Sequence, residues 1–131
     1  MALGSQLEAH SVLGERARAL VPLADEWADY GDTEGRIADA VVARLHDDGL
    51  YAMWVPKALG GSELDPVQSL EVLENVSYGD ASAGWVLMAS CLSIGTGGAY
   101  LSDAATAEMW ADGKRPVIAG QGTRPGTATP T

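Results

Sequence analysis

The sequence predicts an all-α fold in which five to six helices pack around a central buried helix. The first observation is a stretch that follows Asp80, a good helix N-cap, and stays apolar or small through Ile94, with no charged residue between Ala81 and Ser102. A helix that is hydrophobic on every side belongs in a protein interior. The second observation is that the other helical segments each carry one apolar stripe, which suits them to cover this central helix.

Two helices are expected in the first 48 residues. The first runs from about Gln6 to Tyr30, and Pro22 inside it removes a backbone hydrogen bond, so the helix should kink or split there. Its apolar stripe consists of Leu13, Ala17, Leu20, Ala24 and Trp27. A turn at Gly31 leads to a second helix, capped by Asp32 or Thr33 and ending near Asp48, where Gly49 supplies the left-handed residue. Its stripe consists of Ile37, Val41 and Leu45.

The middle of the chain contains a short apolar connector and a third helix. Pro56 biases Val55 away from helix, so we expect residues 50–56 to be an extended, buried connector. Asp65 followed by Pro66 is a strong helix start, because aspartate caps well and proline suits the first helical position. The side chains expected to point inward from this helix are those of Val67, Leu70, Leu73 and Val76.

The end of the chain changes character. Gly95, Gly97 and Gly98 should end the central helix early, and a last helix is expected from Ser102 or Asp103 through Trp110. Val117 and Ile118 then follow a turn and indicate the start of a β-strand. A single strand has nothing to pair with in a helical chain. We therefore interpret residues 1–114 as a helical domain and residues 115–131 as the first strand of a truncated middle β domain.

Composition and charge exclude several classes of function. The formal net charge of −10 argues against binding to nucleic acid or anionic membranes, since both require a basic patch. Cys91 is the only cysteine, so no intramolecular disulfide can form, and we expect an inert core thiol in a cytoplasmic protein. The histidines, His10 and His46, lack the spacing of a metal site. No signal peptide is evident, and the apolar window over residues 81–101 is interrupted by glycine and hydroxyl residues, which favours a core helix over a membrane span.

The order of motifs resembles the amino-terminal helical domain of the acyl-CoA dehydrogenase superfamily of flavoproteins. The segments that carry the resemblance are LHDDGLYAMWVPKALGG at 45–61, LDP at 64–66, LEVLE at 70–74 and GDASAGW at 79–85. Order and spacing agree over roughly residues 14–124. The tryptophan in the last motif is typical of the flavin-dependent two-component monooxygenase branch, whereas true acyl-CoA dehydrogenases usually lack it.

The resemblance implies a flavin cofactor, FAD or FMN, in the complete enzyme. Such enzymes take reduced flavin from a separate flavin reductase, hydroxylate an aromatic or similar small substrate and are usually homo-oligomers. Trp85 corresponds to the family's tryptophan that faces the flavin and substrate cavity, and Ser90 and Ser93 are further candidates for that cavity. The resemblance also places Gln121, Gly122 and Thr123 where the family's first strand passes the flavin. No catalytic residue is assigned, because the family's flavin lies beyond this domain, and the 131 residues alone are expected to be inactive.

Other interpretations remain open on the sequence alone. Trp85 would also suit a core position, and the hydroxyls of Ser90 and Ser93 would also suit local bonds to their own helix carbonyls. An acyl-CoA dehydrogenase that transfers a hydride to FAD is the first alternative function. A non-catalytic helical module that binds a partner or a hydrophobic ligand is the second, and its exposed apolar surface would favour dimerisation.

Overall fold

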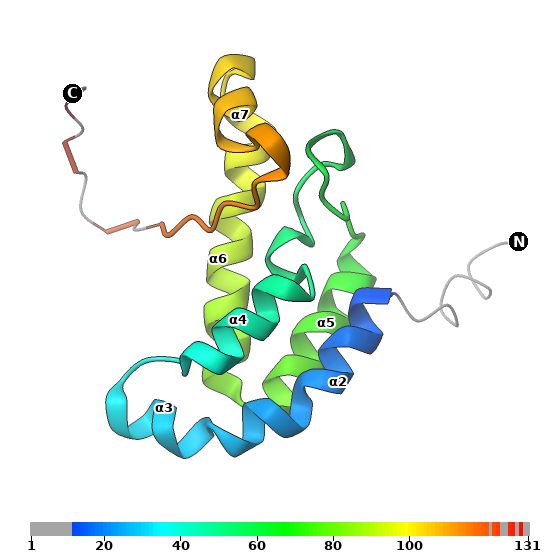
Figure 1. Ribbon diagram of the computed structural model, residues 1–131, viewed down its shortest axis with the longest axis vertical. Coiled ribbons are helices and arrows are strands. Elements are labelled where there is room, and N and C mark those ends of the chain that lie inside the picture. Colours follow the sequence, from blue (N-terminus) through cyan, green and yellow to red (C-terminus); the bar gives the residue numbers. More distant parts are fainter. Residues whose placement is uncertain (1–11, 121, 124–125, 128, 130–131) are drawn as a thin grey trace, which may run out of the picture.

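A computed structural model describes residues 12–120, 122–123, 126–127 and 129, and every regular element among them is helical (Figure 1). The α-helices are α2 (Val12–Glu26), α3 (Ala28–Glu34), α4 (Asp39–Asp47), α5 (Pro66–Gly79), α6 (Ala81–Tyr100) and α7 (Asp103–Met109). Three short 3₁₀ turns, η1 (Leu50–Ala52), η2 (Lys57–Leu59) and η3 (Ala111–Gly113), lie between them or follow them. The predicted all-α fold class is confirmed.

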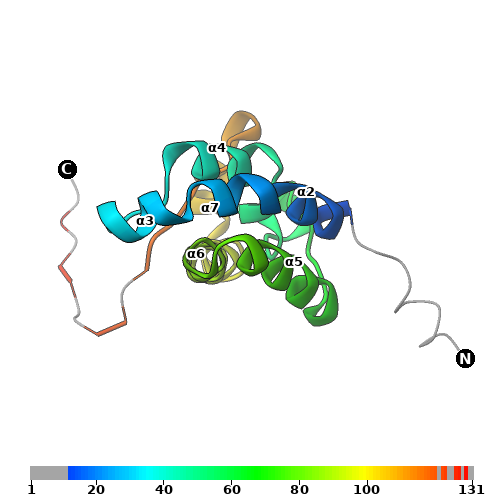
Figure 2. The ribbon, with the colours of Figure 1, turned by 90° about the horizontal axis from the view of Figure 1, so that it is seen from below.

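The helices form two layers. Figure 2 shows α5 and α6 side by side on one side of the molecule, with α2, α3 and α4 on the other. The largest helix contacts are those of α2 with α5 and of α5 with α6. The core between the layers consists mainly of aliphatic side chains, and its fully buried members include Leu20, Leu45, Leu50, Met53, Val72, Val76, Leu87 and Ile94.

The first helical segment breaks later than predicted. Pro22 lies inside α2, and the helix continues past it to Glu26. The ring of Pro22 is exposed, so the lost hydrogen bond can be compensated by water. The break falls at Trp27, where the amide is shared between the carbonyls of Leu23 and Ala24 at 3.3 Å each. The predicted turn at Gly31 is wrong, because α3 runs to Glu34 and Gly35, with φ of 66°, ends it.

The connector after α4 is buried as predicted, but it is not extended. Gly49 has a φ of 75° and turns the chain directly into η1. The amides of Ala52 and Val55 donate to the carbonyls of Gly49 and Ala52, at 3.1 and 3.2 Å. Turns of this kind satisfy the backbone polar groups locally, which a lone extended segment in a helical core cannot do.

The helix α5 starts at the predicted residues, but the side chains that it buries are mostly not the predicted ones. The Asp65 carboxylate accepts a hydrogen bond from the amide of Gln68 at 2.8 Å, and the Gln68 side chain accepts one from the amide of Asp65, which completes a capping box. Of the predicted inward residues, Val67 and Leu70 are 60% and 66% exposed. The buried stripe is instead Ser69, Val72 and Val76. Ser69 is buried because its hydroxyl accepts a 2.7 Å hydrogen bond from the indole of Trp54.

α6 runs straight through the glycines that were expected to end it. A methyl group on Gly95 would lie 2.9 Å from Cβ of Trp54, and one on Gly98 would lie 3.0 Å from Cδ of Pro56. These glycines therefore allow other segments to approach the helix closely.

The expectation that α6 is buried on every side is wrong. Leu87, Cys91 and Ile94 are buried, but Leu92 is 63% exposed and Val86 is 37% exposed. With only two layers, one side of α6 has no described element to cover it.

The expected strand near Val117 is not formed by the described residues, where that segment has no regular secondary structure. A strand needs a second strand to share its backbone hydrogen bonds, and the described part of the chain supplies none. The proposed division at residues 114 and 115 remains a prediction.

Gly84 is a point of close approach between α6 and α5. A methyl group there would lie 2.9 Å from Cβ of Ser77 and would also clash with its hydroxyl. We expect Gly84→Ala to lower the free energy of unfolding by about 1–3 kcal/mol, the usual effect of overpacking. Gly31→Ala is the matched control, since its methyl group would meet only ordinary contacts at 3.7 Å and should stabilise helix α3 by up to about 1 kcal/mol. Urea unfolding followed by circular dichroism would measure both, and equal effects would contradict the close α5–α6 contact.

Candidate functional site

Trp85 lies on the outer side of α6, away from the core. Its side chain is 68% exposed and stands in the first turns of the helix, after the Asp80 cap. Leu92, which is 63% exposed, lies on the same side two turns later. The core interpretation of Trp85 is therefore wrong. An exposed indole and an exposed leucine on an uncharged helix form an apolar wall that is open to a ligand or to another protein surface.

The two candidate serines lie elsewhere on the helix. At about 100° per residue, Ser93 is rotated by about 80° from Trp85 and Ser90 by about 140°. The Ser93 hydroxyl donates to the carbonyl of Ala89 at 3.3 Å, the local helix bond that was the alternative to a ligand contact. Ser93 thus lies at the edge of the wall, and Ser90 does not belong to it.

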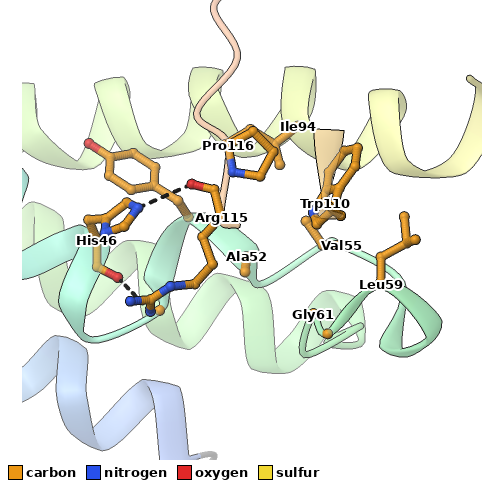
Figure 3. Close-up of a pocket in the computed structure, with 12 residues that line it drawn as sticks. His46, Ala52, Val55, Leu59, Gly61, Ile94, Trp110, Arg115 and Pro116 are labelled. Atoms are coloured by element: carbon orange, nitrogen blue, oxygen red, sulfur yellow. Dashed lines mark hydrogen bonds between the residues drawn. The ribbon is translucent and has the colours of Figure 1, made fainter. Parts of the chain in front are cut away.

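The segment of residues 114–120, here called the C-terminal strap, crosses α6 next to Ser93. A methyl group on Gly120 would lie 2.5 Å from Oγ of Ser93, and one on Gly97 would lie 3.0 Å from the Ile118 side chain. The strap is tied to α4 by reciprocal bonds of 3.1 Å, in which the Arg115 guanidinium donates to the carbonyl of His46 and the His46 ring pairs with the carbonyl of Arg115 (Figure 3).

The predicted cofactor-binding residues follow the strap directly. Gln121 lies outside the described residues, whereas Gly122 and Thr123 are described and exposed. The structure brings Gly120, the last residue of the strap, to the Ser93 edge of α6. It does not bring it to Trp85, which is eight residues or about 12 Å further along the helix axis.

A small cavity lies beneath the strap. Figure 3 shows His46, Ile94, Trp110, Arg115 and Pro116 around it. Its volume of ≈ 20 Å³ has room for a water molecule and not for an aromatic ring system. Sequence reasoning did not identify this contact of α4 with the strap, because residues 46 and 115 are joined by tertiary structure alone. The cavity is a structural junction, and the open wall of α6 is the better candidate site.

The layer formed by α5 and α6 also has an apolar groove, which lies beside α5. It is open to solvent, has a volume of ≈ 440 Å³, and is lined by Trp54, Leu64, Pro66, Ser69, Leu70 and Leu73. The described residues form open surfaces both here and on the outer side of α6. They include no group of three or more His, Cys, Asp or Glu side chains that could hold a metal ion.

Cys91 is the only thiol, and it is buried against the connector. Its Sγ lies 3.5 Å from the carbonyl oxygens of Leu50 and Tyr51, to both of which it can donate a weak hydrogen bond. Burial raises the pKa of Cys91 to about 12, so the group is a neutral thiol at physiological pH. A buried thiol without thiolate character is a poor nucleophile, so Cys91 is placed as a core side chain.

The described helices include none that is long and apolar enough to cross a membrane.

The exposure of Trp85 predicts a small effect on stability. Trp85→Ala should change the free energy of unfolding by less than about 0.5 kcal/mol, as is usual for a surface position. Trp54→Ala, which removes the bond to Ser69 and leaves a cavity, should cost about 3 kcal/mol or more. Thermal and urea unfolding would compare the two variants, and a large loss for Trp85→Ala would show that the indole is packed in the core.

The burial of Cys91 predicts that the folded protein resists thiol reagents. At pH 8 a disulfide reagent such as DTNB should modify Cys91 only after unfolding. Because the pKa is raised in the folded state from 9.0 to about 12, this group's contribution to stability is full below pH 9 and is lost as the pH rises towards 12. Rapid modification of the native protein would contradict this placement.

The sequence of this chain is similar to that of a known helical domain and to parts of two known enzymes. Residues 9–120 match the model of the acyl-CoA dehydrogenase N-terminal domain. The chain is 33% identical over 92 residues to an indole-3-acetate monooxygenase of Acinetobacter baumannii, an alignment that covers 68% of this chain and 22% of that protein. It is 38% identical over 55 residues to an indole-3-acetate monooxygenase of Pseudomonas putida, covering 42% of this chain and 14% of that protein.

No solved structure gives a significant match. The aligned part corresponds to less than a quarter of the length of either relative. Since the domain model covers nearly the whole chain, the protein belongs to the acyl-CoA dehydrogenase superfamily of flavin oxidoreductases and carries the amino-terminal helical domain of that family.

Proposed function

We propose that this chain is the amino-terminal domain of a flavin-dependent monooxygenase that acts on an aromatic small molecule. The observation that carries the proposal is the exposed Trp85 on an uncharged helix face, where the family resemblance expects a tryptophan that faces the cavity. The names of both relatives, which specify indole-3-acetate, favour a planar aromatic acid as the substrate class. The α6 wall would then form one side of the flavin and substrate cavity.

In this proposal a bound reduced flavin, FAD or FMN, would supply the chemistry that activates molecular oxygen. The residues of this chain position the substrate and exclude water. Trp85 offers a flat aromatic surface, and a stacked or edge-on ring pair is worth about 0.5–1.5 kcal/mol beyond its buried area. Leu92 extends the apolar wall. Because α6 carries no charged residue, the wall keeps a low dielectric next to the reacting ring, where polar contacts from other groups are strengthened.

Ser93 and the strap have a supporting role in the proposal. Gly120 lets the backbone pass against Ser93, and the amides of residues 121–123, which follow it in the sequence, would be available to the flavin. No residue of this chain is proposed to transfer a proton. Between Ala81 and Ala99 the sequence has one titratable side chain, the buried Cys91.

The remaining elements of the proposal follow from the family. The other walls of the cavity belong to a middle β domain and a carboxy-terminal helical bundle, the first of which would begin at residue 115. A separate flavin reductase supplies the reduced flavin, and the complete enzyme is a cytoplasmic homo-oligomer. A dehydrogenase acting on an acyl-CoA is the second candidate, favoured by the name of the matching domain model.

A domain exchange would test the proposed function. Residues 12–120 of this chain would replace the matching amino-terminal segment of the Acinetobacter relative. We expect the chimera to consume indole-3-acetate with oxygen and reduced flavin, whereas the 131-residue chain alone should be inactive because it forms only one wall. Trp85→Ala in the chimera should lower kcat/KM by about tenfold or more, which corresponds to about 1.4 kcal/mol of lost transition-state binding.

The controls separate folding from function. Val12→Ala, which changes an equally exposed residue on α2, should leave the chimera's activity unchanged. Only chimeras with the relative's oligomeric size and flavin content would be assayed. A correctly assembled chimera that oxidises an acyl-CoA and not indole-3-acetate would support the dehydrogenase instead. Equal activity of the Trp85→Ala chimera would remove Trp85 from the cavity.

A further inference from the structure

An open cleft lies where the first turns of α2 and α5 meet the loop of residues 57–64. The two helices run in parallel, so that both begin at the same end of the molecule (Figure 1). The cleft has a volume of ≈ 440 Å³, which is within the usual range for small-molecule sites. Its apolar side chains are those of Val12, Leu13 and Leu64. The described residues that line it include none from α6 or from the strap, so the cleft is separate from the site proposed above.

Two cations line this cleft without a carboxylate partner. Elsewhere among the described residues, the guanidinium groups of Arg18, Arg36 and Arg44 lie 3.5, 2.7 and 2.6 Å from carboxylate oxygens. Arg16 and Lys57 have no such ion pair within the described part of the chain, although the chain has 18 acidic residues against eight basic ones. Their placement at one cleft therefore favours an anion from outside the chain.

The side chains at the cleft keep hydrogen-bond donors for a ligand. Arg16 donates from one Nη to the carbonyl of Asp48 at 2.9 Å, which holds the guanidinium in place. A guanidinium has five N–H groups, so the remaining ones can bind an acceptor such as a carboxylate. Oε1 of Gln68 accepts from the amide of Asp65 at 3.4 Å. Its NH₂ group donates to no described residue and is a further donor at the cleft.

A single carboxylate at the cleft limits the charge of the ligand. Glu63 is the acidic residue in the described lining, and its Oε2 accepts a 2.9 Å hydrogen bond from the backbone amide of Lys57. With the two cations, the formal charge of the described lining is +1. A monoanion neutralises this charge. A dianion would leave an excess of negative charge in a chain whose net charge is already −10.

We propose that this cleft binds a small organic monoanion that consists of a carboxylate and an apolar body. Arg16 and Lys57 bind the carboxylate, and the NH₂ group of Gln68 donates to it. The apolar side chains of α2 and of the loop cover the body of the ligand. For a ligand of about ten non-hydrogen atoms at an open site, we expect a Kd of about 1 mM. The site does not depend on the proposed reaction.

Titration of the ¹⁵N-labelled 131-residue chain with phenylacetate would test the site. Phenylacetamide, which has a similar shape and no charge, is the matched control ligand. We expect phenylacetate to shift the backbone amide signals of residues 57–64 and of Gln68, and phenylacetamide to bind at least about tenfold more weakly. Equal affinities of the two ligands, no saturable shift of these signals, or shifts confined to α6 would overturn the proposal.

Two further ligands test the assigned chemistry. Cyclohexylacetate should bind about as tightly as phenylacetate, because the described lining has no aromatic side chain that could stack on a ring. Inorganic phosphate at pH 8, where it is mainly a dianion, should bind more weakly than either carboxylate. Tighter binding of phosphate would overturn the assignment of an organic monoanion.

Two isosteric substitutions change the charge of the cleft in opposite directions. Lys57→Gln should weaken phenylacetate binding about fivefold, and Glu63→Gln should tighten it about fivefold, as expected for exposed charges. The new amide oxygen of the second variant can still accept from the amide of residue 57. Lys114→Gln and Glu108→Gln remove the same charges from exposed positions outside the cleft and should change the Kd by less than about twofold. Effects of equal sign for the two cleft variants, or equally large effects of the controls, would overturn the proposal.

Arg16→Gln tests the fixed cation. It should weaken binding about tenfold or more, because it removes the charge and the fork of N–H donors. The variant also loses the bond to Asp48 at the end of α4, so circular dichroism would establish that it is folded. An unchanged Kd of the folded variant would overturn the proposal. If the variant does not fold, the substitutions of Lys57 and Glu63 still decide, since both side chains are exposed.

Discussion

The uncharged helix α6 is covered on one side only, and this constraint determines how the rest of the molecule is arranged. Its inner side packs against α5 through Gly84 and Ser77, and against the connector through Gly95 and Trp54. These close approaches fix α5 and α6 in one layer. The outer side then keeps Trp85 and Leu92 in water, and each such side chain forgoes about 1.5–3 kcal/mol of burial. A surface with this composition favours any partner that covers it.

The position of the C-terminal strap also depends on α6. It crosses α6 where Gly97 and Gly120 remove the side chains that would keep the two segments apart. The reciprocal bonds between His46 and Arg115 then hold its beginning against the end of α4. The path of the strap up to Gly120 is therefore set by contacts that lie far from Trp85.

Local signals in the sequence identified three helix starts and the buried stripes of α2 and α4, and they missed the burial pattern of α5 and α6. The second helix was expected to start at Asp32 or Thr33, whereas α4 starts at Asp39. The caps at Asp65, Asp80 and Ser102 are all observed, because a cap is made by residues two or three positions apart. On α5 the stripe of apolar residues and the buried stripe differ, since Ser69 is buried through a bond to Trp54 that no apolar periodicity can reveal. The glycines of α6 were wrongly interpreted as a helix end, because the segments they accommodate come from distant parts of the chain.

The candidate site shows the same division between local and tertiary information. Trp85 was identified through a motif, and its exposure depends on the absence of a third layer among the described residues. The helical period alone places Ser90 on a different side of α6 from Trp85.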